Sequence, residues 1–151
     1  LVGSEMCIRD SKAMLASGLK LRNYGTVVVS VADEDKEETL PLVRRFYNMG
    51  FNIEATTLTG TYLKANGIRT RIRRKPSEDS TEVLDSIRAG YVSYVINTRA
   101  VLSGRHYGDG IAIRQCAAQN NITMLTSLDT VRMLLDVLEE VTLGISTIDA
   151  E

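Results

Sequence analysis

The fold is set by one short stretch of the chain, Thr26-Val27-Val28-Val29-Ser30-Val31-Ala32, which is apolar at almost every position. A strand with one face in solvent alternates apolar and polar residues, whereas a strand of a parallel sheet is covered on both faces and is apolar nearly throughout. We therefore expect residues 26–32 to form a central strand of a parallel sheet.

Four further β-branched or apolar runs follow, at residues 51–56, 69–75, 91–97 and 122–126. Stretches with apolar residues at helical spacing alternate with them, at residues 37–49, 59–66, 79–90, 111–119 and 127–143. Alternation of strands and helices is typical of βαβ units around a parallel sheet. The sequence predicts a three-layer α/β fold, with a five-stranded parallel sheet flanked by helices. Pro41 in the first helix predicts a kink or a late helix start.

The pattern also divides the chain into three parts. Residues 26–143 form the expected domain, residues 1–25 are interpreted as a leader and linker remnant, and residues 144–151 as a short tail. At 44% hydrophobic and 25% charged residues, the composition is that of a globular protein. The net charge of −1 gives the whole molecule no attraction to nucleic acid or to an anionic membrane surface.

The chemically reactive residue types do not cluster. Cys7 and Cys116 are far apart and fit neither a disulfide framework nor a metal site, so we interpret both as free thiols in a reducing cytosol. His106 lies in a glycine-flanked segment and is interpreted as a solvated loop residue. No apolar run approaches the roughly 18 residues that span a bilayer. We expect a cytoplasmic protein with no metal site and no membrane segment.

Ligands of open parallel sheets bind beyond the carboxyl ends of the strands. In this chain the expected strand ends carry hydroxyl groups, an amide, a carboxylate and a lysine, with Lys36 at the start of the following helix. The residues are Ser30, Asp33, Thr56, Thr59, Lys75, Asn97, Thr98, Thr126 and Ser127. Short donors, helix N-termini and a cation together suit a phosphate group.

Each of these residues also has a purely structural interpretation. Thr56, Thr59 and Ser127 are ordinary helix caps, and Asn97-Thr98 suits a simple turn. Lys75 ends the basic run at residues 69–75, which is typical of a solvated edge strand. Acidic residues after Ala32 are favoured at any helix N-terminus. Convergence of the polar groups on one sheet edge is what favours a binding site.

Several segments together resemble the methylglyoxal-synthase-like domain that closes the large subunit of carbamoyl phosphate synthetase. The resemblance runs in order from about residue 26 to residue 140, and residues 12–21 resemble the segment that enters this domain from the second ATP-grasp unit. The segments that carry it are residues 30–36, 50–56, 67–68, 74–78, 95–98, 109–114 and 126–130.

This resemblance implies an allosteric domain without catalytic residues or cofactors of its own. It implies a nucleotide effector such as UMP or IMP, and a parent ligase of arginine or pyrimidine synthesis that uses ATP with magnesium and potassium ions. The implied partners are the rest of the large subunit and the glutaminase small subunit. The family's phosphate-binding pattern falls on Ser30, Lys36, Thr56, Thr59, Lys75, Asn97 and Thr98.

The chain departs from that family pattern in two places. The phosphate turn commonly reads Thr-x-Gly-Thr, but here Leu58 stands before Thr59 and Gly60 is displaced by two positions. The segment at residues 99–105 also differs, so the identity of the effector stays open. A structural interaction domain that has lost effector binding is therefore one alternative.

Two enzymes of similar fold are further alternatives. A methylglyoxal synthase needs a carboxylate base in the loop after Thr98, and no acid lies between Thr98 and Gly108. An inosinate cyclohydrolase domain continues with a segment rich in proline and methionine, which does not follow Lys75. Both alternatives are therefore less well supported than the regulatory domain.

Overall fold

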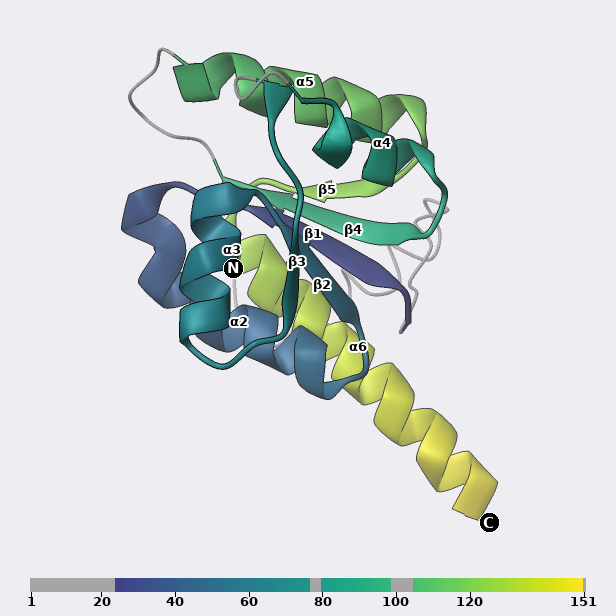
Figure 1. The fold of residues 1–151 in the computed structure, drawn as a ribbon. Coiled ribbons are helices and arrows are strands. Elements are labelled where there is room, and N and C mark those ends of the chain that lie inside the picture. The colour runs from purple at the N-terminus through teal and green to yellow at the C-terminus, as the bar shows by residue number, and fades with distance from the viewer. Residues whose placement is uncertain (1–23, 77–79, 99–104, 151) are drawn as a thin grey trace.

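A computed structural model describes residues 24–76, 80–98 and 105–150. Its sheet is entirely parallel and has the strand order β3-β2-β1-β4-β5 (Figure 1). The strands are β1 (Thr26–Ser30), β2 (Asn52–Ala55), β3 (Thr70–Ile72), β4 (Val92–Asn97) and β5 (Thr123–Leu125). The predicted five-stranded parallel sheet is confirmed, and the valine-rich stretch forms its central strand.

Helices cover both faces of the sheet and complete three layers (Figure 1). One face carries α2 (Lys36–Asn48), α3 (Thr57–Ala65) and α6 (Leu128–Ala150), with the short 3-10 helix η1 (Asp33–Asp35) leading into α2. The opposite face carries α4 (Glu82–Arg88) and α5 (Arg105–Gln119). The predicted three-layer architecture is confirmed.

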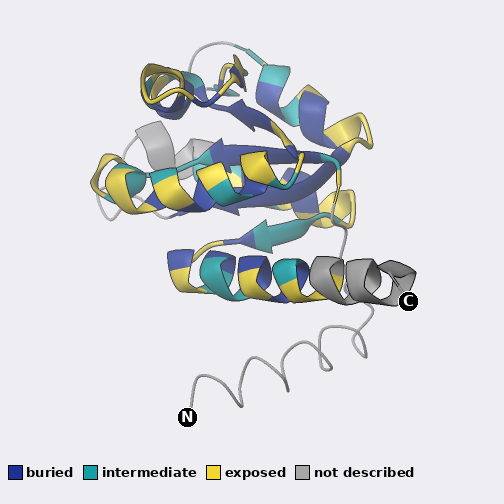
Figure 2. Cartoon of the chain, turned by 90° about the horizontal axis from the view of Figure 1, so that it is seen from below, coloured by how far each residue is buried: buried dark blue, intermediate teal, exposed yellow. Residues whose placement is uncertain are grey.

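The core lies on either side of β1, whose residues Val27, Val28 and Val29 are 0% exposed. Val27 and Val29 pack toward α2 and α6, and Val28 packs toward α4 and α5. Figure 2 shows the same layering, with buried strands between helices that are exposed on their outer sides. Burial of each such side chain contributes about 1.5–3 kcal/mol. Strand β1 and its neighbour β4 both contribute side chains to the two halves of the core.

Helix α2 differs in one respect from the sequence-based expectation. It begins at Lys36, directly after η1, so of the two effects expected from Pro41, a kink or a late start, the late start does not occur. Pro41 and Glu37 are both exposed, and the Glu37 carbonyl that loses its helical partner can bond to water instead. The helix ends at Asn48 with Met49 as its C-cap, and Gly50 follows as predicted, with a φ of +98° that suits glycine.

Helix α6 continues beyond the expected end of the domain at residue 143. It reaches Ala150, so residues 144–150 are helical, and the division of the chain into leader, domain and tail stays a prediction. Residues 1–23 of the predicted leader lie outside the described residues. Within the described part of the chain, no helix is long and apolar enough to cross a membrane.

Candidate functional site

The carboxyl ends of the three central strands bring polar side chains together. Ser30 ends β1, Asn97 ends β4 and is its register partner, and Thr56 directly follows β2 on the other side. The Thr56 hydroxyl donates a hydrogen bond to the Ser30 hydroxyl, with 3.2 Å between the oxygens. The Asn97 side-chain amide donates to the Gly110 carbonyl of α5 at 3.2 Å.

Two more hydroxyls hold the backbone that follows β1. The Val31 N–H donates to the Thr59 hydroxyl at 3.3 Å, and the Ala32 N–H donates to the Thr98 hydroxyl at 3.0 Å. A hydroxyl that accepts one hydrogen bond still has its own hydrogen to donate. Both threonines can therefore hold the loop and also donate to an anion.

The capping interpretation does not hold for Thr56. This residue precedes α3 as its N-cap, but its side chain makes no capping hydrogen bond. The first helical backbone bond runs from the Gly60 N–H to the Thr56 carbonyl. The first N–H groups of a helix have no partner within it, and they direct positive charge beyond the end of the helix. The N-terminus of α3 thus opens beside the Thr56 hydroxyl.

The two predicted lysines lie at the same sheet edge in different surroundings. Lys75 follows β3 and is only 9% exposed, which is low for a residue that normally stays in solvent. The Lys36 ammonium lies 2.7 Å from an Asp33 carboxylate oxygen, and Asp33 itself is exposed. An anion that binds Lys36 has to compete with Asp33 for it.

The structure therefore joins most of the predicted set. Thr56 is hydrogen-bonded to Ser30, and both Thr59 and Thr98 accept hydrogen bonds from the backbone that follows Ser30. The Asn97 side chain bonds instead to the backbone of α5. Lys36 and Lys75 are brought to this edge by the elements they begin or follow. The assignment of these residues to phosphate stays a prediction.

Toward β5 the same edge becomes acidic. A hollow of about 410 Å³ lies between the starts of α2 and α6, with Thr98 and Ser127 in its lining. Its charged lining residues are Glu34, Asp35, Glu38 and Asp129. Arg132 forms ion pairs with both Glu38 and Asp129, so one cation faces four carboxylates and the hollow stays net negative. This charge repels an anion, so a phosphate is favoured on the β1, β2 and β3 side and not near Ser127.

Leu58 and Gly60 occupy different environments in the first turns of α3. The Leu58 side chain is 55% exposed and so does not pack against the sheet. A Cβ on Gly60 would lie 2.8 Å from Cγ1 of Ile72, which means that Gly60 permits close packing of α3 on β3. Gly60 therefore serves helix packing and does not replace the glycine that the phosphate turn of the family carries.

An ion pair beneath this site was missed by the sequence analysis. Glu54 of β2 has a side chain only 4% exposed, and it accepts a hydrogen bond from Nε of Arg73 at 3.0 Å. The bond to Glu54 raises the pKa of the Arg73 guanidinium against the opposing effect of burial, and Tyr91 adds to the rise. The expectation that residues 69–75 form a solvated run is wrong for Arg73. The sequence signal for this ion pair was a carboxylate between Ile53 and Ala55 in a strand expected to be buried, because a buried charge needs a partner.

A second missed residue is Arg114 of α5. Its Nε atom is buried and finds no hydrogen-bond partner among the described residues. Arg114 lies one helical turn after Gly110, which accepts the bond from Asn97. An arginine on an otherwise amphipathic helix gives no sequence signal that sets it apart from a surface residue.

The comparison with protein families identifies the domain. The family model of the MGS-like domain matches residues 38–126, more than half of the 151-residue chain. The chain belongs to the MGS-like domain family. The matched segment runs from the first turn of α2 to the residue after β5, so it includes β2, β3, β4 and β5 with the polar residues that follow them, whereas β1 with Ser30, and Lys36, precede it.

Two solved structures share the fold of this chain. Methylglyoxal synthase from Elizabethkingia anophelis NUHP1 aligns with a TM-score of 0.63 and 16% identity, over 75% of this chain and 78% of that chain. A protein named ForH aligns with a TM-score of 0.59 and 20% identity, over 78% of this chain and 80% of that chain. Likeness at these identities carries the fold alone, so the function of this MGS-like domain rests on its own residues.

Replacement of Glu54 by glutamine should destabilise the domain. Arg73 would keep a neutral acceptor but lose the carboxylate, so we expect the free energy of unfolding to fall by about 1.5–3 kcal/mol. Urea denaturation measures this as a lower midpoint at unchanged slope. The matched control is Glu82→Gln, because Glu82 pairs with Arg74 at an exposed place and should matter little. Equal effects of the two substitutions would contradict a structural role for the buried pair.

Proposed function

We propose that this MGS-like domain is a regulatory module that binds the phosphate group of a nucleotide effector at the carboxyl edge of its sheet. The observation that carries the proposal is the convergence of the hydroxyls of Ser30, Thr56 and Thr59 with the N-terminus of α3. Hydroxyl and backbone donors at a helix N-terminus are the groups that phosphate oxygens accept from. Lys75 supplies the charge that complements a dianion.

The neighbouring carboxylates support a regulatory role over a catalytic one. Asp33 lies in an ion pair with Lys36, and Glu54 is bound to Arg73. A general base has to be free to take a proton from the substrate, and a carboxylate held by a cation is a weak base. Asp33 and Glu54 are therefore poor candidates for a general base, and this supports phosphate binding over catalysis at these strand ends.

The proposed parent is the large subunit of carbamoyl phosphate synthetase. Support comes from the ordered resemblance over about residues 26–140, together with the MGS-like fold. The effector is then UMP or an IMP-like nucleotide, and the partners are the remainder of the large subunit and the glutaminase subunit. Such a domain changes catalysis by binding its effector unequally in two states of the parent.

Substitution of Lys75 by alanine should weaken binding of UMP and IMP to the chain at least about tenfold, because a charge-assisted hydrogen bond to phosphate is lost. Titration calorimetry measures the dissociation constants. Arg71→Ala is the matched control, since Arg71 is an exposed cation of β3 that pairs in register with Glu54 and precedes the strand end that Lys75 follows. Equal losses from the two substitutions would indicate a diffuse basic field and contradict a defined phosphate site.

Leu58 should limit the affinity of the same site. Its side chain is exposed in the first turn of α3, where phosphate oxygens have to come within about 3 Å of backbone N–H groups. We expect Leu58→Gly to bind UMP or IMP several-fold more tightly by calorimetry. Thr61→Gly, an exposed site in the next turn of the same helix, controls for the general effect of glycine on α3. Unchanged affinity in Leu58→Gly would show that the leucine points away from the phosphate.

The chain should produce no methylglyoxal from dihydroxyacetone phosphate at micromolar concentration. The rival function, a phosphate-eliminating lyase, requires a free carboxylate base beside the bound triose phosphate. A coupled assay for methylglyoxal measures the turnover directly. Turnover that one carboxylate substitution abolishes would overturn the regulatory proposal and establish the enzyme instead.

A further inference from the structure

Strand β3 leaves one side of its backbone without a partner strand. It lies at the end of the sheet and pairs with β2 alone. The Arg73 N–H donates to the Ala55 carbonyl at 2.8 Å. Because the backbone groups of a parallel strand alternate in direction, Ile72 directs its N–H and C=O away from β2. Within the described residues no strand pairs with this side.

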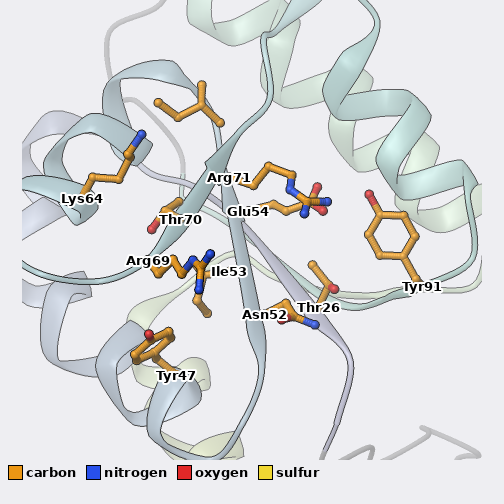
Figure 3. A pocket seen from close by; sticks show the side chains of 11 residues that line it. Thr26, Tyr47, Asn52, Ile53, Glu54, Lys64, Arg69, Thr70, Arg71 and Tyr91 are labelled. Atoms are coloured by element: carbon orange, nitrogen blue, oxygen red, sulfur yellow. The ribbon is translucent and has the colours of Figure 1, made fainter.

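A hollow of about 820 Å³ extends along both sides of β3. Figure 3 shows Lys64 and Tyr47 on one side of the strand, and Arg71, Asn52 and Tyr91 on the other. A strand that is added to a sheet edge directs successive side chains to opposite faces. Such a strand beside β3 would place its side chains alternately in the two halves of this hollow. A small anion could occupy only one of them.

The charges of the hollow favour an acidic ligand. Lys64, Arg69 and Arg71 line it, and the side chain of none of them makes a hydrogen bond or ion pair with another described residue. The acid in this lining, Glu54, is already bound to Arg73. The chain as a whole has a net charge of −1, so this basic edge is a local feature. Opposite charge on a partner attracts it and fixes its register.

We propose that the β3 edge binds an extended acidic segment of a partner polypeptide. The segment lies beside β3 as an additional strand, with its backbone bonded to the N–H and C=O of Ile72. Its carboxylates pair with Arg71 in one half of the hollow and with Lys64 in the other. Cations on an edge strand also serve to prevent pairing between sheets. A purely protective edge does not need an open hollow on both sides of the strand, and this feature favours the binding role.

The probe for the test is a capped eight-residue peptide in which glutamate and threonine alternate. Fluorescence anisotropy with the 151-residue chain measures its affinity, and amide exchange followed by NMR reports on Ile72. We expect exchange at the Ile72 N–H to slow at least about tenfold in the complex, because that group gains a hydrogen-bond partner. Arg71→Glu should weaken peptide binding at least about tenfold. Arg88→Glu is the control, since Arg88 is an exposed arginine of α4 outside the hollow.

Backbone methylation separates strand addition from charge attraction. Two versions of the peptide carry N-methyl groups at either the odd or the even residues. An added strand bonds through one edge only, so one version should bind like the parent peptide and the other at least about tenfold more weakly. Equal binding of both versions, or equal displacement by citrate at the same carboxylate concentration, would reduce the site to a basic patch and overturn the proposal.

Self-association is the remaining outcome that would overturn it. If the chain without peptide forms dimers in sedimentation and Ile72 is already protected in them, a second copy occupies the edge. Nucleotide titration of Arg71→Glu distinguishes this proposal from the previous one. That variant should lose the acidic peptide but retain UMP or IMP binding, because Arg71 lies outside the hydroxyl cluster at the strand ends.

Discussion

Burial of β1 on both faces is the constraint on which the rest of this domain depends. Val27, Val28 and Val29 have no exposed surface, so helices have to cover the sheet on both sides. Because β1 lies between β2 and β4, the same constraint aligns the ends of these three strands. The polar residues that follow each strand then meet at one edge. The site is thus a consequence of packing as much as of its own residues.

The hydroxyls at this edge have two roles that do not exclude each other. Thr59 and Thr98 accept hydrogen bonds from the backbone after β1, and Thr56 donates to Ser30. These bonds hold the loop and the start of α3 in place before any ligand arrives. A site that is already ordered loses less conformational entropy on binding. Thr56, Thr59 and Thr98 are buried, so a ligand would contact a surface on which little of these side chains is accessible. The exposed Leu58 lies at the margin of this surface.

Charge is segregated along the sheet although the net charge is close to zero. The β3 side carries Lys64, Arg69 and Arg71, whereas the hollow near β5 carries Glu34, Glu38 and further acids. Between them, Glu54 and Arg73 neutralise each other beneath the strand ends. An anion therefore meets a favourable potential on one side of the domain and an unfavourable one on the other. Such a field orients a ligand even where individual contacts are weak.

The sequence by itself determined the layers, the parallel sheet and the approximate bounds of the strands. These features follow from local patterns, because an apolar run and a helical period can each be recognised from residues that are close together in the sequence. The sequence also placed the polar residues at strand ends, because the residues that follow parallel strands all lie at the carboxyl edge of the sheet. For α2 the sequence predicted a kink or a late start. The helix begins at Lys36, and Glu37 and Pro41 are exposed, so water can replace the lost helical bond.

Only the tertiary structure decided which partners those residues take. Thr56 bonds to Ser30 rather than to its own helix, and Arg73 of a basic run pairs with Glu54 on the next strand. Gly60 proved to be a packing glycine because Ile72 of β3 lies against it. Each of these contacts joins residues from different elements, at distances that depend on register and layer spacing. No local pattern contains that information, because it arises only when strands and helices pack together.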